Sequence, residues 1–158
     1  MGKELASTNV SFDFLKGSSE FLNLVLNNIS SCVLLLNRDM ELQEFNNAMK
    51  TIFTARKDEY LLYVRCGEAI GCAYQVEEMK DCGTTSHCSF CELRLAALTS
   101  YSEDKVVFKE SIIKPFLNGE GEKVDKHLQF STRLFRFKGE RYILMIIDDI
   151  THLSTLNQ

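Results

Sequence analysis

Residues 31–49 read SCVLLLNRDMELQEFNNAM and carry the clearest structural signal in this chain. Residues 32–36 form a short apolar run of Cys, Val and Leu, which is typical of a buried strand. The polar triplet at 37–39 favours a turn. Residues 41–45 then predict a second strand that pairs back on the first as a hairpin. Asn46 is a favourable N-cap residue, so the sequence predicts that a helix begins there.

Three further strand-like runs occupy the C-terminal third of the chain, at residues 105–116, 126–137 and 141–148. Asn-Gly at 118–119 and Lys-Gly at 138–139 separate these runs, and such pairs favour hairpin turns. In the second run the apolar residues change parity between Leu134 and Phe135. This change predicts either a β-bulge or a strand with two apolar faces.

Helical signals lie before the first strand and between the two groups of strands. Residues 1–17 predict a polar N-terminal arm, so the domain itself would span 18–158. Ser18 or Ser19 would cap an amphipathic helix, whose apolar residues recur at helical spacing: Phe21, Leu22, Val25, Leu26 and Ile29. Further helices are predicted over 46–53, 57–64 and 92–99. This order of elements predicts an α+β domain, in which helices cover one face of an antiparallel sheet.

The bulk composition limits the classes of protein to which the chain can belong. Its 158 residues fit one domain, and 45% hydrophobic with 25% charged residues is ordinary for a globular protein. A formal net charge of −4 provides no basic footprint for nucleic acid. No apolar run is long enough for a signal peptide or a membrane span. We therefore expect a cytoplasmic protein, whose six cysteines are reduced thiols or metal ligands.

Both ends of the predicted sheet resemble the PAS family of sensor domains. The opening hairpin at 31–49 is similar to the first two PAS strands and the helix that follows them. The segment YILMIIDDITHL at 142–153 is similar to the last PAS strand, and it closes on the Asp149-Ile150-Thr151 ending that is typical of PAS sensors. The resemblance covers roughly residues 20 to 153. It implies a five-stranded antiparallel sheet, with helices between the second and third strands.

Five of the six cysteines lie in a cysteine-rich insert at residues 66–91. From Cys72 onward the pattern is C-x9-C-x5-C-x2-C, which comprises Cys72, Cys82, Cys88 and Cys91. Cys88 and Cys91 are three residues apart, so both thiolates can bind one metal ion from a single turn. The pattern differs from the paired C-x2-4-C motifs of zinc ribbons and from the ferredoxin run. Cys32 lies in an apolar strand and is expected to be a core residue.

The same insert resembles that of a subgroup of bacterial PAS sensors with a four-cysteine metal or iron–sulfur motif. The matching elements are Gly71-Cys72, Cys82-Gly83-Thr84, and Cys88 with Cys91. The resemblance implies that these four cysteines bind the cofactor. In that pattern a Pro usually precedes the residues corresponding to Gly67-Glu68, whereas this chain has Cys66. Cys66 is therefore open to three interpretations: a spare thiol, an alternate ligand or a resolving thiol.

The favoured interpretation is a PAS input domain that senses redox state, oxygen or nitric oxide through an iron–sulfur cluster bound by the four cysteines. It would relay the signal to a histidine-kinase-type output, and it would form a homodimer through the N-terminal helix. The apolar face of that helix could equally cap the sheet. The main alternative is a dimerisation or interaction module with a structural zinc site on the same four cysteines. A thiol–disulfide switch at Cys88 and Cys91 is a third possibility.

Catalysis by this chain is not expected. The sequence contains no P-loop, dinucleotide-binding glycine pattern, nucleophile elbow or kinase signature. A thiol oxidoreductase that uses Cys88 and Cys91 would need a thioredoxin-like βαβ unit around the motif, and the predicted order of elements does not provide one.

Overall fold

A computed structural model describes residues 18–56, 59–80, 83, 85 and 91–156 of the chain. The predicted N-terminal arm at 1–17 lies outside these residues, as do Cys82 and Cys88. In chain order the elements are α1 (Ser19–Leu26), β1 (Cys32–Leu36), β2 (Leu42–Phe45), α2 (Ala48–Ile52), α3 (Cys66–Ile70), α4 (Ala73–Glu77), α5 (Glu92–Glu103), β3 (Val107–Leu117), β4 (Lys123–Phe137), β5 (Glu140–Asp149) and α6 (Thr151–Leu156). None of the helices in this described part is both long enough and apolar enough to cross a bilayer.

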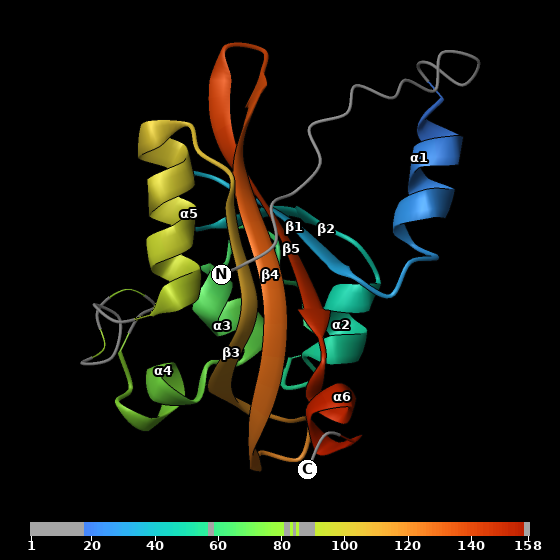
Figure 1. Cartoon of the computed structure of the whole chain (residues 1–158). Coiled ribbons are helices and arrows are strands. Elements are labelled where there is room, and N and C mark those ends of the chain that lie inside the picture. The colour runs from blue at the N-terminus through green and yellow to red at the C-terminus, as the bar shows by residue number, and fades with distance from the viewer. Residues whose placement is uncertain (1–17, 57–58, 81–82, 84, 86–90, 157–158) are drawn as a thin grey trace.

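The five strands form one antiparallel sheet in the order β2-β1-β5-β4-β3 (Figure 1). β5 lies between β1 and β4, with Cys32 opposite Ile147 on one side and Phe130 opposite Ile147 on the other. The N-terminal hairpin is thus joined to the C-terminal strands in a single sheet. The predicted α+β class with a five-stranded antiparallel sheet is confirmed.

One face of the sheet is buried beneath helices. Alternate residues of β1 are buried, as expected for a strand with one covered face. The core contains sheet residues such as Leu34, Phe130 and Met145, and α2, α3 and α5 pack on them through Met49, Ile70, Leu93 and Ala97. The prediction that helices cover one face is confirmed for these three helices.

Cys32 is fully buried in this core, as predicted. Burial, with a smaller effect from the nearby Asp148 charge, raises the pKa of its thiol far above the ordinary value. The thiol therefore stays neutral and acts as a small apolar side chain.

The predicted irregularity in the sheet lies on a different strand. β4 pairs with β5 in unbroken register from Leu128 to Phe137, so the bulge predicted for β4 is absent from this pairing. The register shift is on β3, between Lys109 and Ile112. The parity change in β4 instead marks the far end of the β4–β5 hairpin, where Phe135 is 42% exposed.

Two helix predictions need correction. α2 begins after Asn47, and Asn46 is buried and does not cap it. The Asn46 amide instead accepts from the Val33 N–H and donates to the carbonyls of Leu26 and Ser31. Its side chain satisfies backbone groups of other segments, a role that local sequence cannot reveal.

Residues 59–64, which belong to the helix predicted over 57–64, form turns and bends. Residues 57 and 58 lie outside the described part. The Tyr63 N–H donates to the Leu42 carbonyl, and the Leu42 N–H donates to the Val64 carbonyl at 2.7 Å. This segment satisfies its backbone groups at the edge of β2, which replaces the hydrogen bonds of a helix.

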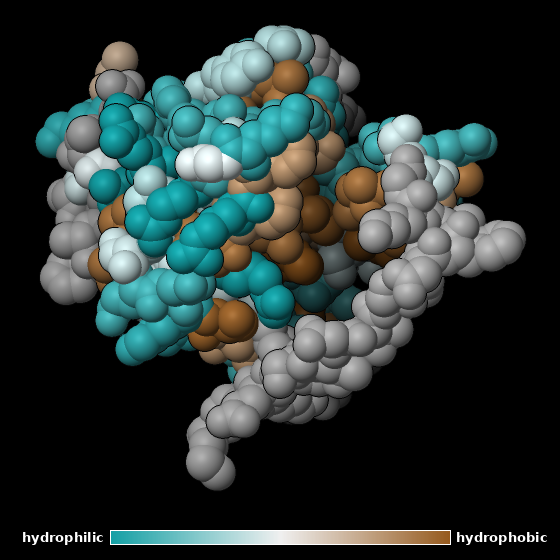
Figure 2. All heavy atoms as spheres, turned by 90° about the horizontal axis from the view of Figure 1, so that it is seen from above, coloured by the Kyte–Doolittle hydropathy of each residue, from teal (hydrophilic) through white to brown (hydrophobic). Residues whose placement is uncertain are grey.

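The N-terminal helix α1 does not cap the sheet. Ser18 caps it as predicted, because its hydroxyl accepts from the Phe21 N–H at 3.2 Å. None of its residues is buried, and it lies apart from the sheet (Figure 1). Apolar residues reach the molecular surface on this side of the domain (Figure 2).

Candidate metal centre at the cysteine-rich segment

A small cavity of about 30 Å³ lies where α3, α4 and α5 meet β3. Its walls contain three cysteines, two cationic side chains and apolar groups: Met40, Cys66, Gly67, Ile70, Cys72, Tyr74, Gln75, Thr85, Cys91, Leu93, Arg94 and Lys114. No carboxylate occurs among these lining residues of the described part. The cavity therefore combines soft sulfur donors with positive charge.

Cys72 is held at the turn between α3 and α4. Gly71 ends α3 in the left-handed conformation with φ 79°, which favours glycine. The Gly71 carbonyl accepts from the Leu117 N–H at 2.8 Å, and Cys72 itself forms an isolated β-bridge with Phe116. The backbone of Cys72 is thereby attached to the end of β3.

Cys91 enters the cavity from another element. It is the N-cap residue of α5, with an extended backbone, and its side chain makes no capping hydrogen bond. The thiol is consequently not used to end the helix. The helix macrodipole favours a thiolate at this end of α5. Leu93 and Ala97 pack on the core and hold the first turns of α5 in place.

Lys114 extends from β3 to the two cysteines. Its Nζ lies 5.2 Å from the centre of the Tyr74 ring, and it hydrogen-bonds with the Cys72 sulfur. Burial alone would lower the Lys114 pKa, but the neighbouring Cys91 and Cys72 outweigh it and raise that pKa above its ordinary value. The ammonium therefore stays charged beside both sulfurs.

Arg94 contributes the second cation. Gly83, which follows Cys82 in the sequence, has φ 96°, and a Cβ built on it would lie 2.7 Å from the Arg94 Nη1. Thr85 is 8% exposed and also lines the cavity. Both described residues of the 81–90 loop are thus next to the cavity that contains Cys72 and Cys91.

The structure brings together only part of the predicted ligand set. Cys72 and Cys91 line one cavity, whereas Cys82 and Cys88 lie outside the described residues. Cys66 is 3% exposed and lines the same cavity. Among the described residues, however, no three Cys, His, Asp or Glu side chains lie close enough together to bind a metal ion. Cys66 therefore does not complete a three-ligand group with Cys72 and Cys91 here.

Sequence reasoning missed both cations. Lys114 lies in a predicted strand and shares the parity of Ile112 and Phe116, which are buried. A lysine on the inward parity was the available signal, but the adjacent Ile113 concealed it. Arg94 lies in a stretch of strong helix formers and gave no signal of its own. The donor set as a whole fits a thiolate-bound metal centre, because excess thiolate charge needs nearby cations.

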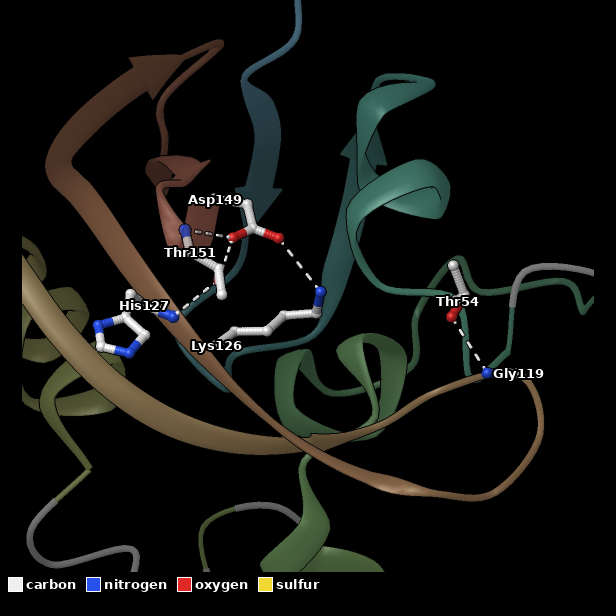
Figure 3. A network of polar contacts seen from close by, with 6 residues as sticks. All are labelled: Thr54, Gly119, Lys126, His127, Asp149 and Thr151. Carbon is white, nitrogen blue, oxygen red and sulfur yellow. Dashed lines mark hydrogen bonds and ion pairs between the residues drawn. The ribbon is translucent and has the colours of Figure 1, made fainter. Parts of the chain in front are cut away.

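A second polar site joins the end of β5 to α6 (Figure 3). Asp149 accepts hydrogen bonds from the Thr151 N–H and hydroxyl, and it pairs with the Lys126 ammonium at 3.1 Å. The Thr151 hydroxyl oxygen accepts from the His127 N–H. Partial burial by itself raises the Asp149 pKa, but these hydrogen bonds and the Lys126 charge outweigh it and lower that pKa. The predicted Asp149-Ile150-Thr151 ending therefore connects β4, β5 and α6.

No protein family and no curated protein matches this sequence. Solved structures do match its fold. The PAS domain of nitrogen regulation protein NR(II) from Vibrio parahaemolyticus is 12% identical, with 82% of this chain and 97% of that chain covered and a TM-score of 0.59. The PAS domain of Bordetella pertussis BvgS is 16% identical, with 87% and 89% covered and a TM-score of 0.55.

A PAS domain from a two-component sensor histidine kinase is 8% identical, with 82% of this chain and 94% of that chain covered and a TM-score of 0.54. At these identities the likeness concerns the fold alone. The fold predicted from the hairpin and the C-terminal strands is confirmed by it. The four-cysteine motif is not part of what these comparisons establish.

Proposed function

Since the chain has the PAS fold, we propose that it is a signal-sensing input domain whose signal is received at a thiolate-bound iron–sulfur cluster. Cys72, Cys82, Cys88 and Cys91 would bind the cluster. The observation that carries this proposal is the shared cavity of Cys72 and Cys91, which come from different elements and meet beside Lys114 and Arg94. Cysteines that had only packing roles would not need two cations around them.

The placement of the cavity favours a sensory role for the metal. The sheet, α2 and α5 form an apolar core that includes Leu34, Phe130 and Met145, and none of these residues lines the cavity. A domain of this size with such a core does not need a metal to fold. A metal centre beside a complete core is better suited to redox or gas chemistry, and an iron–sulfur cluster provides that chemistry when bound.

A structural zinc site is the second candidate, and the cavity volume favours it. A space of about 30 Å³ suits a single ion more readily than a cluster of several atoms. Zinc with four cysteine ligands is also a common structural centre. In that case the domain would serve as a dimerisation or interaction module, and the metal would carry no redox signal.

The attachments of the two described ligands suggest a route for the signal. Cys72 is bridged to Phe116 on β3, and Cys91 begins α5, which packs on β4 and β5. A change at the metal would alter both contacts and reach α6, which follows β5. The output would be a partner protein or a further domain of the histidine-kinase type, as in the kinase whose PAS domain has a similar fold. The domain itself would be a non-catalytic regulator in the cytoplasm.

The first experiment is metal and sulfide analysis of protein purified without air, with an absorption spectrum before and after dithionite. We expect iron, acid-labile sulfide and a visible absorbance that bleaches on reduction. Zinc alone, also after anaerobic reconstitution with iron and sulfide, would replace the cluster proposal by the structural zinc site. The absence of any metal in both preparations would contradict both proposals.

Ligand variants test the assignment residue by residue. Cys91→Ser should lose most of the bound metal and keep its far-ultraviolet circular dichroism, because the core does not depend on the centre. Cys66→Ala is the matched control: it lines the same cavity, but we expect it to keep wild-type metal content. If Cys91→Ser and Cys72→Ser both keep wild-type metal content, the assigned ligands are wrong.

A further inference from the structure

Lys114 is a charged side chain in an environment that provides no carboxylate to balance it among the described residues. It extends inward from β3, with its ammonium near the Tyr74 ring and beside the sulfurs of Cys72 and Cys91. The described lining of the cavity contains Arg94 as a second cation and no Asp or Glu. An ammonium that leaves bulk water is costly unless an opposite charge compensates for it.

A metal centre with four thiolate ligands would supply that opposite charge. Four thiolates bring more negative charge than a divalent metal ion or an oxidised iron–sulfur core brings positive charge. The centre is therefore anionic, and its reduction by one electron makes it more so. A cation in a partly desolvated cavity stabilises the reduced form more than the oxidised form, since the attraction grows with the negative charge of the centre.

We propose that Lys114 is the counter-cation that sets the reduction potential of this centre. The inference rests on the proposed iron–sulfur function and deepens it. Lys114 acts through its contacts with Cys72 and Cys91, so it is a positioning and tuning residue and not a ligand. In the step concerned, dithionite gives one electron to the cluster and is itself oxidised. No bond to Lys114 forms or breaks.

The position of Lys114 on β3 connects this electrostatic role to the fold. The same strand carries Phe116, whose backbone bridges Cys72, and Leu117, whose N–H binds the Gly71 carbonyl. One strand thus supplies the charge that faces the centre and the backbone that holds one of its ligands. Arg94 provides a second positive charge from α5, so the loss of Lys114 should shift the potential without abolishing binding of the cluster.

The test is a redox titration of the full chain after anaerobic reconstitution with ferrous iron and sulfide. Lys114→Met and Lys114→Gln remove the charge, and Lys114→Arg keeps it. Lys109→Met is the matched control, because it removes an exposed lysine from the same strand. We expect both neutral Lys114 variants to shift the midpoint to more negative values. The expected size is at least tenfold in the equilibrium constant for reduction, which is about 59 mV for one electron. Lys114→Arg and Lys109→Met should stay near wild type.

Two results would overturn the inference while leaving the proposed function intact. The first is a neutral Lys114 variant with wild-type iron content and a wild-type midpoint. The second is an equal shift in Lys109→Met, which would show a general effect of surface charge. A folded neutral variant that binds no cluster, while Lys114→Arg does, would support the counter-cation role. Failure of the wild-type protein itself to bind iron would overturn the proposed function, and this inference with it.

Discussion

Gly71 shows how a single residue holds the candidate centre in place. Its left-handed backbone lies directly before Cys72, and a Cβ there would lie 2.7 Å from the Ala55 Cβ and 3.2 Å from the Leu117 carbonyl oxygen. Glycine is therefore required for two reasons: the conformation and the close approach of neighbouring chain segments. Figure 3 shows a nearby contact of the same segments, in which the Gly119 N–H donates to the Thr54 hydroxyl at 3.1 Å.

Gly71→Ala should be strongly destabilising. The left-handed conformation costs a residue with a Cβ roughly 1–2 kcal/mol, and overpacking typically adds about 1–3 kcal/mol. We expect a loss of at least about 2 kcal/mol in the free energy of unfolding, measured by urea denaturation. Gly121→Ala is the control, because Gly121 also has φ 79° but has no neighbouring atom within 4 Å. Equal losses in the two variants would show that the contacts with Ala55 and Leu117 do not matter.

At the scale of the elements, Asp149 joins the last strands to α6. Its pKa is lower in the folded than in the unfolded chain, where a value of about 3.9 is usual. The carboxylate therefore contributes stability above that unfolded pKa, and the contribution is lost as the pH falls through the lower folded value. The interactions responsible are those with Thr151 and Lys126, on either side of the end of β5.

Asp149→Asn should reduce stability near neutral pH and lose this effect in acid. We expect a lower midpoint of urea denaturation than wild type at about pH 7 and nearly equal midpoints at about pH 3, below the unfolded pKa. Asp125→Asn, at an exposed position of β4, is the control and should follow the wild type at both pH values. A difference between Asp149→Asn and wild type that is the same at both pH values would exclude the carboxylate as its source.

At the scale of the whole molecule, α1 is a helix with exposed apolar side chains. Leu22 and Val25 are 55% and 41% exposed and share one helix face, and Ile29, just beyond the helix, is 40% exposed. The end of α1 is attached to the domain by polar contacts, among them that of the Asn46 amide with the Leu26 carbonyl at 2.7 Å. Exposed apolar surface of this kind is typical of an interaction site. These observations support the proposal of a homodimer through α1.

Light scattering coupled to size exclusion can test that proposal on the full chain. We expect a dimer for the wild type and a monomer for the double variant Leu22→Glu with Val25→Glu, because charges on the helix face oppose its burial. Leu95→Glu is the control: Leu95 is 47% exposed, but it lies on α5, outside the proposed interface. A monomeric wild type, or a monomeric Leu95→Glu variant, would argue against an interface formed by α1.

The sequence by itself determined the strands, their turns and the predicted cysteine ligands, because strand periodicity, turn propensity and ligand spacing depend on residues that are neighbours in the chain. The PAS fold followed from the order of those elements and from the resemblance of the two end segments. Tertiary structure decided the roles that depend on distant segments. Asn46 satisfies backbone groups from α1 and β1, so its predicted role as an N-cap was wrong.

Lys114 was found only in the folded molecule for the same physical reason. The register shift between Lys109 and Ile112 changes which parity of β3 faces inward, and local sequence does not show where such a shift occurs. After the shift, Ile112, Lys114 and Phe116 share the inward parity, and Lys114 reaches the cavity of Cys72 and Cys91. Packing between β3 and the first turns of α4 and α5 thus decided the charge around the candidate centre.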